Sequence, residues 1–174
     1  TELDRKEEPV AAFSSALEID PTLDPVRAER LNLNLALDNE SAISADLDYL
    51  ATTAKDPALM LREVAKRRVD QNSKPDALRV LKKALEVDPT DRLTRSSYAG
   101  ILIDLEHNGE ALPIVQGLLD EDPDDLLARL KMGFLLANMK RFKDALPILE
   151  YVYARRPDDE ALLLKLAYTY QTLE

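Results

Sequence analysis

Apolar residues recur along this chain at the three- and four-residue spacing of one α-helix face, and short polar segments separate one such run from the next. Val10, Phe13 and Leu17, for example, share one helical face, and Pro21 then ends the helix. Sustained alternation of apolar and polar residues, which marks a half-buried strand, is almost absent. The pattern therefore predicts an all-α protein of ten helices: a lone helix, four antiparallel pairs and a final lone helix.

Three prolines set the period of this pattern, since Pro89, Pro123 and Pro157 follow one another at intervals of 34 residues. A small residue comes ten positions after each proline, and in the two complete units an alanine follows 12 positions after that. These positions are Ala99, Gly133, Ala167, Ala111 and Ala145. A fixed period of this length is typical of stacked supersecondary units. Small residues are needed where the two helices of a pair cross closely.

The period divides the chain into a lead-in and a single solenoid of helical repeats. Residues 1–8 are charged and carry no apolar stripe, so a flexible lead-in is predicted there. The solenoid, residues 9–174, consists of a second helix at 9–20, units at 22–55, 57–87, 89–121 and 123–155, and a first helix at 157–174. The 22–55 unit is the most divergent, because Leu31 occupies its small position and Ala42 precedes Pro57 by 15 residues rather than 12. An extra helical turn is expected in this unit.

These units resemble the tetratricopeptide-repeat family, whose 34-residue unit is a helix, a turn and a second helix. The family's large-small pair corresponds here to Val64 and Ala65, Tyr98 and Ala99, Met132 and Gly133, and Leu166 and Ala167. Its second-helix alanine corresponds to Ala42, Ala77, Ala111 and Ala145, and its closing proline to Pro21, Pro89, Pro123 and Pro157. Its tryptophan is replaced by Leu61, Arg95, Arg129 and Leu163. The resemblance is strongest from residue 57 onward. It implies a right-handed superhelix of stacked antiparallel helix pairs that acts as a non-catalytic scaffold for protein-protein interaction.

Charge and composition narrow the choice of partners. The chain has 23 basic and 33 acidic residues, a net charge of −10. This charge opposes sequence-independent attraction to phosphate backbones, so no nucleic acid is expected as a partner. No apolar run reaches the roughly 18 residues that a membrane-spanning helix needs, so direct membrane insertion is not expected. We expect a soluble protein, and the cytoplasm and the bacterial periplasmic face both stay open as its compartment.

Residues suited to catalysis or metal binding are sparse. There is no cysteine, and the single histidine, His107, has no second imidazole or thiolate to complete a metal site. It is expected to face solvent or to cap the preceding helix. Acidic residues such as Asp124 and Asp125 gather at turns, where they favour the N-terminus of the next helix. We therefore predict a protein that is not an enzyme and that needs neither metal nor cofactor.

The resemblance also implies where a partner protein or peptide binds, because the first helix of each pair lines the concave surface of such a superhelix. The partner-binding residues that it implies are Arg62, Lys66, Leu93, Leu127, Leu130, Phe134, Leu164 and Tyr168. This surface is basic toward the amino end and apolar or aromatic toward the carboxyl end. Burial between repeats is an equal alternative for Leu130, Phe134 and Tyr168. A solvated helix face is the alternative for Arg62 and Lys66.

The residues at these positions favour one kind of partner over another. Some members of the family bind the C-terminal carboxylate of chaperones through lysine, asparagine and arginine, and this set is not reproduced here. An amphipathic segment fits better, with large apolar side chains against Phe134 and Tyr168 and an acidic end near Arg62. The alternatives are a homo-oligomer assembled through the exposed terminal helices and a regulatory module that senses a peptide on the same surface.

Overall fold

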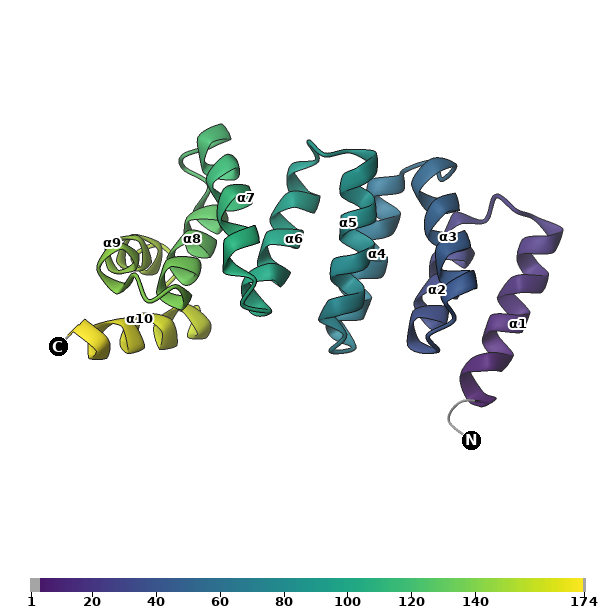
Figure 1. Cartoon of the computed structure of the whole chain (residues 1–174), viewed down its shortest axis with the longest axis horizontal. Coiled ribbons are helices and arrows are strands. Elements are labelled where there is room, and N and C mark those ends of the chain that lie inside the picture. Colours follow the sequence, from purple (N-terminus) through teal and green to yellow (C-terminus); the bar gives the residue numbers. More distant parts are fainter. Residues whose placement is uncertain (1–3, 174) are drawn as a thin grey trace. The chain divides into compact units, whose positions relative to one another are not determined.

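The structure is a computed structural model that describes residues 4–173, and their side chains from residue 7 onward. These residues form ten α-helices and no strand (Figure 1). The helices are α1 (Asp4–Ile19), α2 (Asp24–Ala36), α3 (Glu40–Thr52), α4 (Pro57–Asp70), α5 (Lys74–Val87), α6 (Arg92–Asp104), α7 (Asn108–Glu121), α8 (Leu126–Asn138), α9 (Phe142–Tyr153) and α10 (Glu160–Leu173). The chain divides into two compact units: unit 1 ends at Thr94, and unit 2 begins at Arg95. The predicted all-α fold of helical repeats is confirmed.

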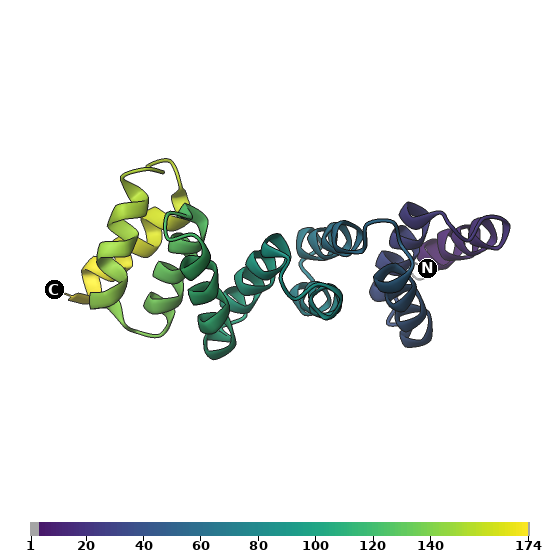
Figure 2. The same ribbon diagram turned by 90° about the horizontal axis from the view of Figure 1, so that it is seen from above.

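In unit 1, short connections bring consecutive helices back alongside one another, as Figures 1 and 2 show. Helix α2 contacts α1, α3 and α4, and α5 contacts both α3 and α4. The interfaces are filled by leucines that are almost completely buried. These are Leu31, Leu50, Leu61 and Leu81. The apolar faces predicted from the helical spacing therefore meet in one core within unit 1.

Unit 2 is built in the same way, with α8 in contact with α7, α9 and α10. Small residues stand at its closest helix crossings. Ala111 and Ala145 are completely buried, and a Cβ atom added to Gly133 would lie 2.6 Å from Cδ2 of Leu149 on α9. The small positions of the 34-residue period thus allow close helix contact, as predicted. Ala167, at the same position of α10, is exposed.

The first helix starts earlier than the sequence predicted. α1 begins at Asp4, five residues before Pro9, and includes the proline. A proline in the second turn removes only one backbone hydrogen-bond donor, so the charged residues before it can be helical. The lead-in expected over residues 1–8 therefore lies partly inside α1, and residues 1–3 are outside the described part of the chain.

The divergent unit gains no helical turn, so the expected extra turn was wrong. Helix α3 ends at Thr52, and its connection to α4 is no longer than the connection between α5 and α6. The interval from Ala42 is longer because Pro57 is the first residue of α4, whereas Pro89 lies in the turn before α6. In this connection Ala54 is buried, and the backbone N–H of Lys55 donates to Oδ2 of Asp24 at 3.0 Å. The hydrogen bond holds this connection against α2.

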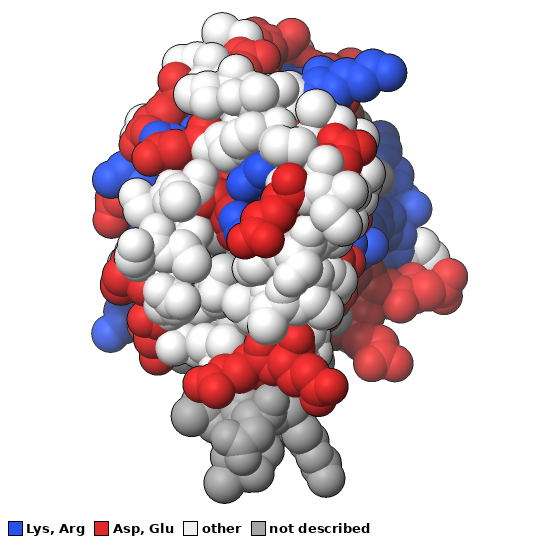
Figure 3. All heavy atoms as spheres, turned by 90° about the vertical axis from the view of Figure 1, so that its right-hand side faces the viewer, with Lys and Arg blue, Asp and Glu red and all other residues white. Residues whose placement is uncertain are grey.

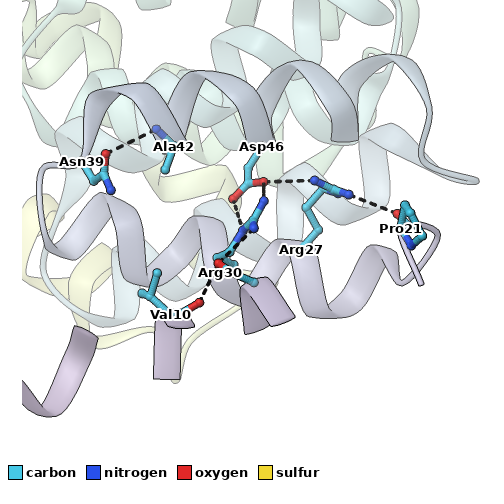
Figure 4. A network of polar contacts seen from close by, with 8 residues as sticks. Val10, Pro21, Arg27, Arg30, Asn39, Ala42 and Asp46 are labelled. Carbon is cyan, nitrogen blue, oxygen red and sulfur yellow. Dashed lines mark hydrogen bonds and ion pairs between the residues drawn. The ribbon is translucent and has the colours of Figure 1, made fainter. Parts of the chain in front are cut away.

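A buried cluster of charged residues joins the first three helices (Figure 4). The side chain of Asp46 on α3 is completely buried and accepts hydrogen bonds from Arg27 Nη1 at 3.3 Å and from Arg30 Nη2 and Nε at 2.6 and 3.0 Å. Arg27 also donates to the carbonyl oxygen of Pro21, and Arg30 donates to Oγ of Ser14 on α1, each at 3.1 Å. Since both carboxylate oxygens have arginine partners, the cluster ties α1, α2 and α3 together.

Candidate functional site

A hollow of about 480 Å³ opens on the surface of unit 2. It is lined by α6, α8 and α10, the first helices of successive pairs. The lining residues are Ile103, Asp104 and Glu106 at the end of α6, Phe134 and Asn138 on α8, and Ala161, Leu164, Lys165 and Tyr168 on α10. Residues on α10 at this spacing share one helix face, as do Phe134 and Asn138. Three residues selected from the sequence, Phe134, Leu164 and Tyr168, therefore lie around one hollow.

The apolar side of the hollow is unusually exposed. Leu164 and Tyr168 keep 72% and 56% of their surface accessible to solvent, and Phe134 is half-buried. Tyr168 is held by an edge-to-face contact with Phe142 on α9, with 5.8 Å between the ring centroids. Large apolar side chains that stay exposed beside a hollow are typical of a surface that binds another molecule.

A polar network joins three of the residues that line the same hollow. The ammonium group of Lys165 donates to Oδ1 of Asn138 at 2.8 Å, and Nδ2 of Asn138 donates to the carbonyl oxygen of Ile103 at 3.4 Å. The Lys165 ammonium also lies 5.5 Å from the centroid of the Phe134 ring, where a cation is attracted to the aromatic face. These contacts connect α6, α8 and α10 and fix the side chains between them.

Two carboxylates stand on the α6 side of the hollow, and both are exposed. Glu106 follows the end of α6 in the left-handed backbone region, with a φ of 60°, and the N–H of His107 donates back to the carbonyl of Leu102 at 2.8 Å. Asp104 lies near Lys131 on α8. Burial lowers the pKa of the Lys131 ammonium, and the charges of Asp125 and Asp104 oppose this shift.

The other two predicted residues of unit 2 do not line the hollow. Leu130 is half-buried one turn before Phe134 on α8, and Leu127 is exposed in the first turn of that helix. They lie nearer the start of α8 than Phe134 and on the same side of the helix, since residues three or four apart share a helix face.

The predicted residues of unit 1 are arranged differently. Arg62 donates to Oδ2 of Asp91 at 2.5 Å and to Oγ1 of Thr94 at 3.3 Å, so its guanidinium stabilises the start of α6. Partial burial raises the pKa of the Asp91 carboxyl, but hydrogen bonds from Thr94 and the charge of Arg62 outweigh burial and leave the pKa below its ordinary value. Lys66 and Leu93 are exposed. No hollow that we describe includes these residues.

The described residues hold no group of three or more His, Asp or Glu side chains placed to bind a metal ion. His107 is half-exposed, and its Nδ1 lies 3.6 Å from the carboxylate of Glu110 in the first turn of α7. Over the same part of the chain, no helix combines the length and the apolar character that crossing a membrane requires.

Two further surfaces lie outside the residues that the sequence pattern selected. Adjoining hollows of about 580 and 610 Å³ lie over α7, α8 and α9, with Leu119, Met132 and Ile148 lining both. The sequence signal for these hollows lay in apolar residues of the second helices outside the family positions, such as Leu119 and Ile148. The face in Figure 3 carries many uncharged atoms, with both acidic and basic side chains among them, and Ile19 at the end of α1 is 88% exposed. Self-association through the terminal helices stays a prediction.

Comparison with known proteins identifies the fold of the chain. No protein-family profile matches the chain, and no curated protein matches it. Among solved structures, MamA (residues 41 to the end) from Desulfovibrio magneticus RS-1 is 27% identical over 67% of this chain, with a TM-score of 0.57. A tetratricopeptide repeat protein from Parabacteroides merdae ATCC 43184 is 15% identical over 94% of the chain, with a TM-score of 0.65. YrrB, described as a TPR protein with an unusual peptide-binding site, is 19% identical over 93%, with a TM-score of 0.61.

The chain is thus an all-α helical-repeat protein, and its fold is that of the tetratricopeptide-repeat family. The resemblance predicted from the 34-residue period is confirmed at the level of the fold. The chain spans 66% and 65% of the length of the first two of these structures and 84% of YrrB.

Proposed function

We propose that the protein is a non-catalytic interaction module that binds a short segment of a partner protein in the hollow of unit 2. The observation that carries this proposal is the arrangement of Phe134, Leu164 and Tyr168 around that hollow, with the last two largely exposed. The fold supports the coarser role of a protein-interaction scaffold, because neighbours of this fold include the peptide-binding protein YrrB.

The size of the hollow favours a peptide segment as the ligand. A volume of about 480 Å³ lies within the range of sites that enclose small ligands, and it has room for a few side chains. Fully burying one large apolar side chain contributes about 1.5–3 kcal/mol. One or two apolar anchors of a partner, together with the newly covered surfaces of Leu164 and Tyr168, therefore supply enough free energy for a moderate affinity.

The proposed site differs from the predicted surface in one respect. Arg62 is left out of it, because its guanidinium already pairs with Asp91 inside unit 1. The acidic end of a partner that the sequence placed near Arg62 would have to compete with this ion pair. The apolar part of the predicted surface, in unit 2, is the part that the proposal keeps.

Peptide-display panning against the folded chain tests the proposal. We compare the wild type with the Leu164→Glu/Tyr168→Glu double variant, which places two charges beside the hollow. The matched control is Leu163→Glu, since Leu163 is the neighbouring residue on α10, is 46% exposed and does not line the hollow. We expect apolar peptides to be enriched by the wild type and by the control, and binding to the double variant to fall at least about tenfold, the loss of roughly one buried anchor.

Circular dichroism checks that all three proteins are equally helical. This hollow is not the binding site if the double variant enriches the same peptides as the wild type. The same conclusion follows if the Leu163→Glu control loses peptide binding as much as the double variant does.

A further inference from the structure

We infer that the partner segment carries a lysine or arginine close to its apolar anchor, and that the carboxylates at the end of α6 receive this charge. The inference rests on the proposed function, because it concerns the chemistry of the ligand that the hollow of unit 2 accepts. The charged groups around the hollow support it, and the apolar pattern of the sequence did not reveal their positions.

The hollow already holds a cation of the protein itself. The ammonium group of Lys165 lies against Oδ1 of Asn138 at 2.8 Å and 5.5 Å from the Phe134 ring centroid. Asn138 is the last residue of α8, and the carbonyl groups at the C-terminal end of a helix attract positive charge. Lys165 therefore occupies the cation position beside the Phe134 ring, and a partner's cation would be placed on the opposite, α6 side of the hollow.

The opposite side of the hollow is acidic and is also a helix end. Asp104 is the last residue of α6, and Glu106 follows two residues later, so the carbonyl end of a second helix adds to both carboxylates. Asp104 lies within the influence of the Lys131 ammonium. Glu106 has no ion pair within the described part of the chain, and its exposed carboxylate is the group that we assign to the partner's cation.

A negatively charged segment would meet unfavourable charges in this hollow. Its carboxylates would face the negative charges of Asp104 and Glu106, against the single positive charge of Lys165 among the lining residues. The net charge of −10 over the chain adds repulsion at longer range. The structure thus favours a cationic partner segment over the acidic one that was expected near Arg62.

The test uses an array of synthetic peptides in which every apolar anchor sequence is present in versions flanked by lysine, by glutamine or by glutamate. We expect the wild-type chain to bind the lysine versions most strongly, with the preference shrinking at high salt. Glu106→Gln keeps the side-chain length at a residue with positive φ. It should weaken the lysine versions about fivefold and leave the glutamine versions unchanged.

Asp158→Asn serves as the matched control, because Asp158 is an exposed carboxylate of unit 2 that does not line the hollow. It should leave the lysine preference of the wild type unchanged. Equal binding of lysine and glutamine versions, stronger binding of glutamate versions, or equal effects of Glu106→Gln and Asp158→Asn would overturn the charge inference while peptide binding itself stands. If the wild type binds no version of any anchor, both this inference and the proposed function fall.

Discussion

Asp46 places a negative charge inside unit 1, and Arg27 and Arg30 are its ion-pair partners there (Figure 4). Asp46→Ala would leave Arg27 and Arg30 without their counter-ion, and both side chains are largely buried. We expect the free energy of unfolding to fall by about 3–5 kcal/mol, the cost of removing one partner from a buried ion pair. Urea unfolding followed by circular dichroism measures this change.

Asp48→Ala is the matched control, since it removes a carboxylate from the same helix. Asp48 is exposed and pairs with the Lys83 ammonium at 2.7 Å, so its loss should cost less than about 1 kcal/mol. Equal destabilisation by the two variants would contradict a structural role of the buried cluster.

Two helical glycines give opposite expectations for the same substitution. At Gly133 an added Cβ atom would lie 2.6 Å from Cδ2 and 3.1 Å from Cγ of Leu149, whereas at Gly117 nothing lies within 4 Å. Gly133→Ala should therefore destabilise unit 2 by about 1–3 kcal/mol through overpacking. Gly117→Ala should stabilise it by about 0.5–1 kcal/mol, because alanine favours a helix interior over glycine. Thermal melting compares both with the wild type, and a stabilising Gly133→Ala would argue against a close α8–α9 crossing.

At the scale of the helices, the sequence predicted what depends on regular spacing. The 34-residue interval located the small residues at the crossings, and Ala111, Ala145 and Gly133 are buried there. Features that depend on local contacts in the folded chain were not predictable. The start of α1 before Pro9 needed knowledge of how one missing donor is tolerated. The interval from Ala42 to Pro57 did not reveal that Pro57 begins α4, whereas Pro89 lies in the turn before α6.

The same distinction applies to the candidate site. Phe134, Leu164 and Tyr168 could be selected because the resemblance assigns one face of each first helix to the concave surface. Glu106 could not, because it follows the end of α6 in a connection that has no helical periodicity. Asn138 shares a helix face with Phe134, but its contacts with Lys165 and Ile103 form only in the folded chain. Polar residues of a site are set by three-dimensional proximity, which helical periodicity does not encode.

At the scale of the whole chain, acid has two opposing effects. Protonating carboxylates reduces the repulsion that accompanies a net charge of −10 and so favours the compact state. It also removes specific interactions. A hydrogen bond from Thr22 lowers the pKa of the Asp20 carboxyl, one from Arg79 lowers the pKa of Glu40, and the pKa of Asp91 is lowered in the same direction. A substitution at one carboxyl separates the specific effect from the general one.

Asp91→Asn is the informative substitution, because Asp91 joins Arg62 of α4 to the first turn of α6 within unit 1. A carboxyl whose pKa is lower in the folded state than its ordinary 3.8 stabilises the fold above that value, and the contribution is lost as the pH falls through the folded pKa. The variant should therefore be about 0.5–1 kcal/mol less stable than the wild type at neutral pH. The difference should shrink below about pH 4 and vanish at the lowest pH at which the protein stays folded. Thermal melts across this range measure it, and a difference that stays constant from neutral to acidic pH would show that the charge of Asp91 does not stabilise the fold.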